Sequence, residues 1–225
     1  YVLIVFVRLL EVFMRPSKYN DPNLGAKGPK NGHLAHIKFK GKRVCLLTNY
    51  RTGSTFFLRE TFQKNQLPLP DDWEYFNQRN FLQAYKKIKR HPEFIFKLMP
   101  DQIQHNFEKL DALKGICNQF VYLYRRDFEA QARSWIAWNV SGDHDYHWGN
   151  KTRIYDIDVT QHTANRYIDQ LIKNYMFIKE IYKKYPDDVY CLEDFPFQKP
   201  YTRKYNWISD IVIPPFNPHK EVFRS

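Results

Sequence analysis

The segment Arg43–Thr61, RVCLLTNYRTGSTFFLRET, constrains the fold of this chain more than any other stretch. It opens with an apolar run, Val44–Leu47, that has the length of a buried strand. A short polar turn follows, and the apolar residues that then recur at helical spacing are Phe56, Phe57, Leu58 and Phe62. A strand that leads through a Gly/Ser/Thr turn into a helix leaves backbone N–H groups at the positive end of the helix dipole. The segment predicts either an anion site, most often for phosphate, or a turn in which Ser54 merely caps the helix.

The residues of this turn carry groups suited to an anion. Gly53 allows close approach of the backbone, and Ser54 and Thr55 supply hydroxyls. Arg51 adds a guanidinium that can bind phosphate oxygens bidentately, and Thr52 lies between it and the glycine. The turn lacks the Gly-Lys-Ser/Thr of a Walker A sequence, so the anion need not belong to a nucleoside triphosphate.

Apolar runs suited to strands alternate with amphipathic segments along the chain. We expect strands at residues 43–48, 94–99, 117–124 and 189–192. We expect helices from residue 55 to about residue 65 and at 80–90, 128–139 and 160–184, and residues 101–113 are also amphipathic. This alternation predicts an α/β domain with three layers, a mostly parallel central sheet and a P-loop-like strand-turn-helix.

The N-terminal region differs in composition from the rest. Residues 1–14 are apolar apart from Arg8 and Glu11, but they are fewer than the ~20 residues of a spanning helix. Residues 16–42 are rich in Gly, Pro, Asn and Lys, which indicates an exposed basic loop. We therefore divide the chain into an N-terminal element with a flexible basic loop, 1–42, and a domain at 43–225. We expect a cytoplasmic protein, and membrane contact through 1–14 or a secretory location, suggested by sequons at Asn139 and Asn150, stays open.

The net charge, the cysteines and the histidines indicate which ligands the chain can bind. A net charge of +11 predicts an anionic partner, without choosing among nucleic acid, membrane and sulfated or phosphorylated ligands. Cys45, Cys117 and Cys191 each lie in or beside an apolar run, which favours buried thiols. His144 and His147 stand in a polar loop with neighbouring aspartates, but no metal-ligand spacing accompanies them, so we expect no metal.

Cations stand at the ends of three predicted strands. Arg51, Lys97 and Arg126 each follow or end such a strand. In a parallel sheet these ends meet at one edge, where ligands of α/β domains bind. The shared position favours the anion site over a simple helix cap.

The residues RTGSTFFLRE, followed by YRRDFEAQARSWIAW, resemble the two-part signature of sulfotransferases that use 3′-phosphoadenosine 5′-phosphosulfate (PAPS). The resemblance implies that residues 51–55 cradle the 5′-phosphosulfate. It also implies that Arg126 and Ser134, eight residues apart, hold the 3′-phosphate, with Arg125 as the competing arginine. The chain is more closely similar to the bacterial trehalose sulfotransferase-like branch, whose motifs match in order at 51–55, 73–76, 97–99, 126–137 and 190–195.

This resemblance also implies a function. We expect a sulfuryl group to pass from PAPS to an acceptor hydroxyl, on a carbohydrate or glycolipid, leaving adenosine 3′,5′-bisphosphate. Arg51 and Lys97 would stabilise the transferring group. Many cytosolic relatives use a His two residues after this Lys, where the present chain has Met99. The resemblance implies Glu74 as the base instead, and without it Glu74 would be read as a surface carboxylate paired with a neighbouring Lys.

Other functions remain open on the sequence. A basic nucleic-acid-binding module would explain the charge and the aromatic content but not the ordered strand-end motifs. A nucleotide kinase would need Walker A and Mg²⁺-binding motifs, which the sequence lacks. A catalytically inactive protein with the PAPS-binding fold would fit the missing histidine. We expect a sulfotransferase whose partner is an acceptor, a small molecule or glycan with a hydroxyl group, and we expect no nucleic-acid partner.

Overall fold

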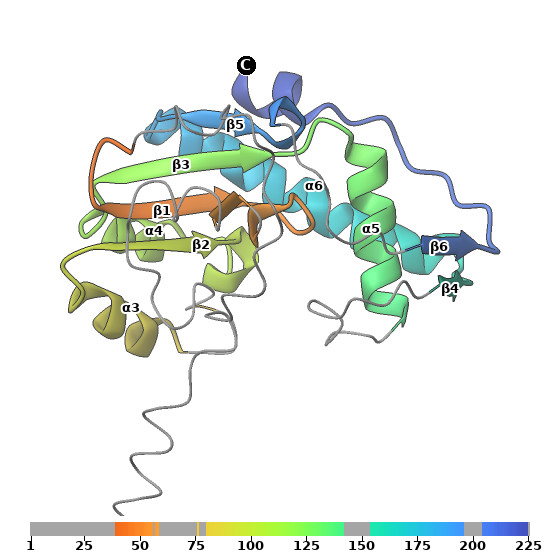
Figure 1. The fold of residues 1–225 in the computed structure, drawn as a ribbon, viewed down its shortest axis with the longest axis horizontal. Coiled ribbons are helices and arrows are strands. Elements are labelled where there is room, and N and C mark those ends of the chain that lie inside the picture. The colour runs from red at the N-terminus through yellow and green to blue at the C-terminus, as the bar shows by residue number, and fades with distance from the viewer. Residues whose placement is uncertain are drawn as a thin grey trace, which may run out of the picture. The chain divides into compact units, whose positions relative to one another are not determined.

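A parallel sheet forms the centre of the structure, a computed structural model that describes residues 39–55, 57–58, 76, 80–141, 154–195 and 204–224. Its strands are β1 (Arg43–Thr48), β2 (Phe94–Leu98), β3 (Gln119–Tyr124) and β5 (Val189–Cys191). They lie in the order β2-β1-β3-β5, and each neighbouring pair is parallel (Figure 1). The predicted α/β class with a mostly parallel sheet is confirmed.

Helices connect these strands, and polar side chains mark where the helices begin. The connecting elements are α3 (Phe81–Lys89), the 3₁₀ helix η3 (Pro100–Ile103), α4 (Phe107–Lys114), α5 (Phe128–Ser141), α6 (Gln161–Lys184) and the 3₁₀ helix η5 (Leu192–Asp194). The side chains of Asn80, Asn106 and Thr160 each accept a backbone N–H in the first turn of the following helix. These caps satisfy donors that have no partner within the helix. Of the helix expected after β1, Ser54, Thr55, Phe57 and Leu58 are helical, and its remainder lies outside the described residues.

Apolar side chains alternate between the two faces of the sheet and build a separate cluster on each. On β1, Cys45 and Leu47 belong to the larger cluster, which also includes buried residues of α3, α4, α5 and α6. Val44 and Leu46 point into the smaller cluster, with Phe57 from the segment after β1. A strand buried on both faces reads as a continuous apolar run, which is why the sequence identifies these strands clearly. Apolar groups on both faces of the sheet are compatible with three layers.

A second, two-stranded sheet lies beside α5 and was not expected. Strands β4 (Ile154–Ile157) and β6 (Lys204–Trp207) pair in parallel at the right of Figure 1. Neither strand is among those that the sequence predicts, because residues around His144 and His147 are polar and the C-terminal part has no clear periodicity. The C-terminal part also contains the π-helical turn η6 (His219–Phe223).

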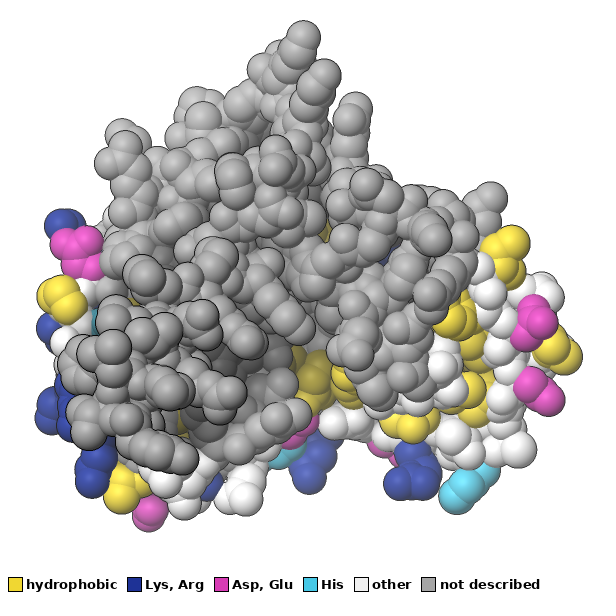
Figure 2. Space-filling view, turned by 60° about the horizontal axis from the view of Figure 1, so that its bottom comes forward, with side chains coloured by type: hydrophobic (Ala, Val, Ile, Leu, Met, Phe, Trp, Pro, Cys, Tyr) yellow, Lys and Arg dark blue, Asp and Glu magenta, His cyan; other side chains and the backbone are white. Residues whose placement is uncertain are grey.

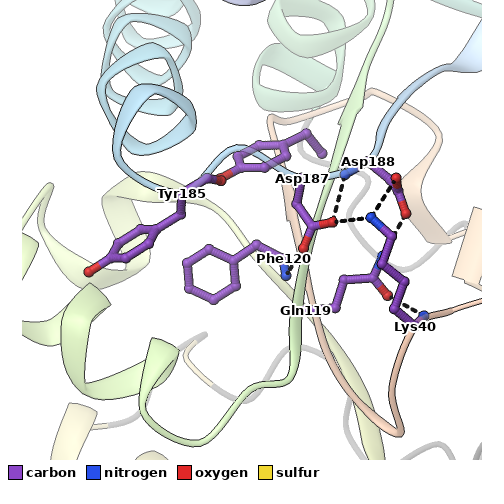
Figure 3. A network of polar contacts seen from close by, with 7 residues as sticks. Lys40, Gln119, Phe120, Tyr185, Asp187 and Asp188 are labelled. Atoms are coloured by element: carbon purple, nitrogen blue, oxygen red, sulfur yellow. Dashed lines mark hydrogen bonds and ion pairs between the residues drawn. The ribbon is translucent and has the colours of Figure 1, made fainter.

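Ion pairs tie the chain together at the edge of the sheet where the strands begin. The Lys40 ammonium lies 3.0 Å from Asp187 Oδ1 and 3.1 Å from Asp188 Oδ1 (Figure 3). The Gln119 amide donates to Asp188 Oδ2 at 2.7 Å and its oxygen accepts the Lys40 N–H at 2.9 Å. Phe39 packs against the smaller cluster. Residues 39–42, which the sequence places in the basic loop, therefore contact the sheet; residues 1–38 lie outside the described part, and the boundary at 42/43 stays a prediction.

The strand order places a topological switch point between β1 and β3. The chain passes from β1 to β2 on one side of β1 and then to β3 on the other. The connections after β1 and β3 therefore leave the sheet in different directions. In open α/β sheets the crevice at such a point, beyond the carboxyl ends of the strands, is the usual ligand site.

Candidate functional site

The turn after β1 contains two residues with positive φ, a conformation that glycine adopts more easily than other residues. Arg51 has φ of 57° and Gly53 has φ of 77°, both in the left-handed region. A Cβ on Gly53 would also lie 2.7 Å from Leu192 Cδ1, which follows β5. Position 53 therefore requires glycine for two reasons, the positive φ and the lack of space for a side chain. The Phe57 N–H donates to the Gly53 carbonyl at 3.0 Å and closes the first helical turn, as the sequence predicted.

Buried hydrogen bonds from Asn49 hold the start of the turn. The Asn49 amide donates to the Leu171 carbonyl of α6 at 2.8 Å. Its oxygen accepts the Tyr50 N–H at 2.9 Å and the Asn174 amide at 3.1 Å. Asn49 and Asn174 are fully buried, so these bonds form away from water, where each lost partner is costly. Helix α6 thereby fixes the direction in which the chain leaves β1.

Gln131 of α5 binds the same turn from the other side. Its amide donates to the Tyr50 carbonyl at 2.6 Å, and its oxygen accepts the Tyr175 hydroxyl at 2.8 Å. The Arg125 N–H donates to the same hydroxyl at 3.5 Å. Burial raises the pKa of Tyr175, so the hydroxyl remains a donor throughout the working pH range. These bonds couple the turn after β1 to the end of β3.

Arg51 and Ser134 meet at this edge although they are far apart in the sequence. Arg51 Nε donates to Ser134 Oγ at 3.1 Å, joining the turn after β1 to helix α5. Lys97, at the end of β2, is 6% exposed and donates to Thr55 Oγ1 at 3.3 Å. Four of the predicted site residues therefore form two contacting pairs. Both pairs place a cation beside a hydroxyl, which is the donor set that an anion with several oxygens requires.

Two other predicted residues of the turn are largely enclosed. Thr52 is fully buried, and its hydroxyl bonds to Thr48 Oγ1 and, at 3.0 Å, to the Asn49 carbonyl. The side chain of Thr52 therefore holds the turn together. Only the backbone of Thr52 is left to bind a ligand. Ser54 is 8% exposed and opens the helical turn.

The adjacent arginines after β3 have different surroundings. The Arg126 side chain is 55% exposed and pairs with Asp194. The Arg125 side chain is 14% exposed, with its Nε 3.6 Å from Glu193 Oε1. Among the described residues, the hydrogen bonds of Ser134 lead to Arg51 and not to Arg126. Ser134, eight residues after Arg126, thus contacts the turn after β1 through Arg51. Arg126 lies at the end of β3 and pairs with Asp194 instead.

Glu193 organises the turn between β3 and α5. Its carboxylate accepts the backbone N–H groups of Arg126 at 2.8 Å and Asp127 at 3.2 Å, and the Cys191 thiol at 3.1 Å. Burial opposes ionisation, but the backbone donors and the thiol outweigh it and lower the pKa of Glu193. Glu193 is therefore ionised near neutral pH and caps the start of α5. This carboxylate therefore fixes the turn between β3 and α5.

An aromatic stack with a carboxylate lies next to the Arg51–Ser134 pair. The rings of Tyr50 and Trp135 are parallel with centroids 4.0 Å apart, and Trp138 stacks on Trp135 at 5.2 Å. The Tyr50 hydroxyl donates to Asp101 Oδ2, which also accepts the Gln170 amide at 3.2 Å. Sequence reasoning named neither Asp101 nor Gln170. The available signal was the place of Asp101, four residues after Lys97 and just beyond the end of β2.

The remaining predicted residue, Glu74, lies outside the described residues, as do His144 and His147. Cys45, Cys117 and Cys191 are buried free thiols, as the sequence predicted. Among the residues that the structure describes, no helix is long and apolar enough to cross a bilayer, and no cluster of His, Cys, Asp or Glu has the arrangement of a metal site. On the face shown in Figure 2, the visible Lys and Arg side chains lie at the margins, with Asp and Glu among them.

Comparison of the chain with family models, with curated proteins and with solved structures finds no match. The assignment of function therefore depends on the geometry of the site and on the motifs of the sequence.

Proposed function

We propose that this protein is a PAPS-dependent sulfotransferase with the sulfotransferase variant of the α/β fold. The observation that carries the proposal is the contact between Arg51 and Ser134 at the switch point of the sheet. The sequence motifs assign Arg51 to the phosphosulfate and Ser134 to the 3′-phosphate. A contact between residues that are 83 positions apart brings the two halves of the signature to one place.

The donors at this edge suit a ligand with two anionic groups. The turn from Arg51 to Thr55 contributes backbone N–H groups and hydroxyls, and Gly53 adopts the positive φ that this turn needs. Arg51 and Lys97 contribute positive charge from two neighbouring strands. Arg126, exposed at the end of β3, can exchange its surface ion pair with Asp194 for a phosphate, because such exposed pairs contribute little stability.

The residues of this chain would act in three ways during transfer. Arg51, Lys97 and the turn N–H groups bind the sulfuryl oxygens and the leaving phosphate, where negative charge grows in the transition state. Arg126 and Ser134 orient the nucleotide through its 3′-phosphate. A carboxylate accepts the proton of the acceptor hydroxyl. The sequence motifs assign this last role to Glu74, and the proposed acceptor is a carbohydrate or glycolipid hydroxyl.

Binding of adenosine 3′,5′-bisphosphate, the nucleotide product, tests the cofactor assignment. The ligand should raise the melting temperature of the protein, because it binds only the folded state. Arg126→Ala and Ser54→Ala should remove most of this shift. Glu129→Gln, an exposed change at the start of α5, is a control that should keep it. The absence of any shift in the wild type at millimolar ligand would overturn the proposal, and salt-sensitive binding of an oligonucleotide instead would indicate a nucleic-acid-binding module.

Transfer itself is measured with labelled PAPS and a panel of acceptors that includes sugars, glycolipids, steroids, phenols and peptides. Glu74→Gln tests the role that the motifs give to Glu74: a base at this position predicts that the variant keeps nucleotide binding and loses transfer, because the amide cannot accept the proton. Retained turnover in this variant would exclude Glu74 as the base.

A further inference from the structure

The carboxylate of Asp101 lies at the end of β2 with its two oxygens in different surroundings. Oδ2 accepts two hydrogen bonds, from the Tyr50 hydroxyl and from the Gln170 amide at 3.2 Å. Oδ1 is buried and, within the described part of the chain, has no hydrogen-bond partner. A buried carboxylate oxygen without a donor is destabilising. Such an atom calls for a partner that the described residues do not provide.

Asp101 is connected directly to both halves of the proposed site. Its partner Tyr50 precedes Arg51 in the turn after β1, and the Tyr50 ring stacks on Trp135, which follows Ser134 in α5. The second partner, Gln170, accepts the Trp135 indole N–H at 3.3 Å. Asp101 is thus one side-chain contact away from the turn that binds the proposed phosphosulfate.

The two donors on Oδ2 also fix the orientation of the carboxylate. Tyr50 and Gln170 come from different elements, so together they restrict rotation of the Asp101 side chain. Oδ1 is left as the oxygen with unused acceptor capacity. A base held by orienting groups, with one acceptor atom available, is the arrangement that general-base catalysis requires.

We propose that Asp101 is the general base that accepts the proton of the acceptor hydroxyl. This inference rests on the proposed sulfotransferase function and assigns to a described residue the role that the motifs give to Glu74. As the acceptor oxygen forms its bond to sulfur, its proton moves to Asp101 Oδ1. The bond between sulfur and the bridging phosphate oxygen breaks, and its electron pair leaves with the nucleotide. The products are a sulfate monoester, adenosine 3′,5′-bisphosphate and a protonated Asp101, which then releases its proton to water.

The surroundings of Asp101 also favour a ring-shaped acceptor with several hydroxyls. Tyr50, Trp135 and Trp138 form a stack beside the carboxylate, and Trp138 is only partly buried. Aromatic faces pack against the apolar faces of ring compounds, while a few placed polar groups orient the hydroxyls. Gln170 and Asp101 are such groups, so we expect sugars to be better acceptors than peptides.

The test compares Asp101→Asn with Asp169→Asn, an exposed change one position from Gln170 on α6. Asparagine keeps an oxygen that can accept the Tyr50 hydroxyl but removes the basic carboxylate. We expect Asp101→Asn to lower kcat for transfer by about 100-fold or more, the usual contribution of a general base. Its melting-temperature shift with adenosine 3′,5′-bisphosphate should match that of the wild type. Asp169→Asn should change neither quantity.

The outcomes separate this inference from the function on which it rests. A wild type that does not bind adenosine 3′,5′-bisphosphate refutes the sulfotransferase proposal. A wild type that binds and transfers, with an Asp101→Asn variant of unchanged kcat, overturns the role of Asp101 alone. If transfer collapses in Glu74→Gln but not in Asp101→Asn, Glu74 is the base. Where the wild type binds the nucleotide but uses no acceptor of the panel, hydrolysis of labelled PAPS replaces the transfer assay, and its absence also overturns the inference.

A second variant keeps the test valid if Asp101→Asn does not fold. Tyr50→Phe retains the ring that stacks on Trp135 and removes one of the two donors that orient Asp101. It should lower kcat while the nucleotide-induced melting shift and KM for the acceptor stay near the wild-type values. An unchanged kcat would show that the orientation of Asp101 has no part in transfer.

Discussion

Gln131 joins the turn after β1 to helix α6, and replacing it with methionine tests whether this buried bridge holds the site together. Gln131 is fully buried, with its amide on the Tyr50 carbonyl at 2.6 Å and its oxygen on the Tyr175 hydroxyl at 2.8 Å. Methionine has a similar volume and shape but neither donates nor strongly accepts. The change therefore removes both hydrogen bonds with little change in packing.

The expected loss of stability follows from the two groups left behind. Each buried polar group that loses its partner costs about 1–3 kcal/mol, so Gln131→Met should lower the free energy of unfolding by roughly 2–6 kcal/mol. Burial raises the pKa of Tyr175, so its hydroxyl cannot escape the penalty by ionising. The Arg125 N–H is a donor to this hydroxyl and cannot replace the lost acceptor.

Urea unfolding followed by tryptophan fluorescence measures this loss for Gln131→Met, Tyr175→Phe and the double variant. Gln131→Met leaves the Tyr175 hydroxyl without its acceptor, and Tyr175→Phe removes that hydroxyl. The loss of unfolding free energy in the double variant should therefore be smaller than the sum of the two single losses by about 1–2 kcal/mol. Glu129→Gln, whose ion pair with Arg133 is exposed, should stay within about 0.5 kcal/mol of the wild type. Additive effects, or a Gln131→Met variant as stable as the wild type, would refute the bridge.

Three further predictions concern other contacts. Ser134→Ala should weaken binding of adenosine 3′,5′-bisphosphate by about 5- to 10-fold in calorimetric titration, because Arg51 and the phosphate lose a shared hydroxyl. Glu193 has a lowered pKa in the folded state, so its carboxylate stabilises the fold above the unfolded pKa and this contribution disappears as pH falls through the folded value. Below about pH 4.3, unfolding midpoints of Glu193→Gln should therefore fall less steeply with pH than those of the wild type. Lys40→Met should reduce the urea midpoint slightly at low salt and not at high salt, because the Lys40 side chain in its ion pairs with Asp187 and Asp188 is 64% exposed; a salt-independent loss would contradict this.

The central sheet could be predicted from the sequence because its strands are buried on both faces. The runs at 43–48, 94–98 and 119–124 are almost fully buried, and most of their residues are apolar. The strong periodicity of α6 and the turn residues after β1 were equally informative. Ser134, which the motif spacing pairs with Arg126, lies in contact with Arg51 in the structure.

Features that depend on distant contacts could not be predicted. Residues 101–113 are amphipathic, yet the structure breaks between η3 and α4, where Gln104 and His105 have φ of 58° and 51°. His105 Nε2 bonds to Asn174 Oδ1 of α6 at 2.8 Å, and Asn106 caps the next helix. Local periodicity cannot report such a bond. Strands β4 and β6 are four residues each and pair across about 50 positions, so neither is distinct on its own.

The buried partners of the site residues were missed for the same reason. Asn49, Gln131 and Tyr175 are ordinary residues in a turn and on two helices until the fold places them together. Polar residues on the buried face of a helix are the one signal that a sequence offers for such a network. Gln131 carried that signal in α5, since it lies on the same face as Trp135.

The contact between Gly53 and Leu192 has a consequence for the evolution of this chain. Leu192 occupies the space that any side chain at position 53 would need, with only 2.7 Å between its Cδ1 and a Cβ placed there. A larger residue at 53 would require both a smaller residue at 192 and a turn that tolerates positive φ. Among descendants of this sequence, positions 53 and 192 should therefore change together or not at all, so the segment after β5 limits how far the turn after β1 can diversify.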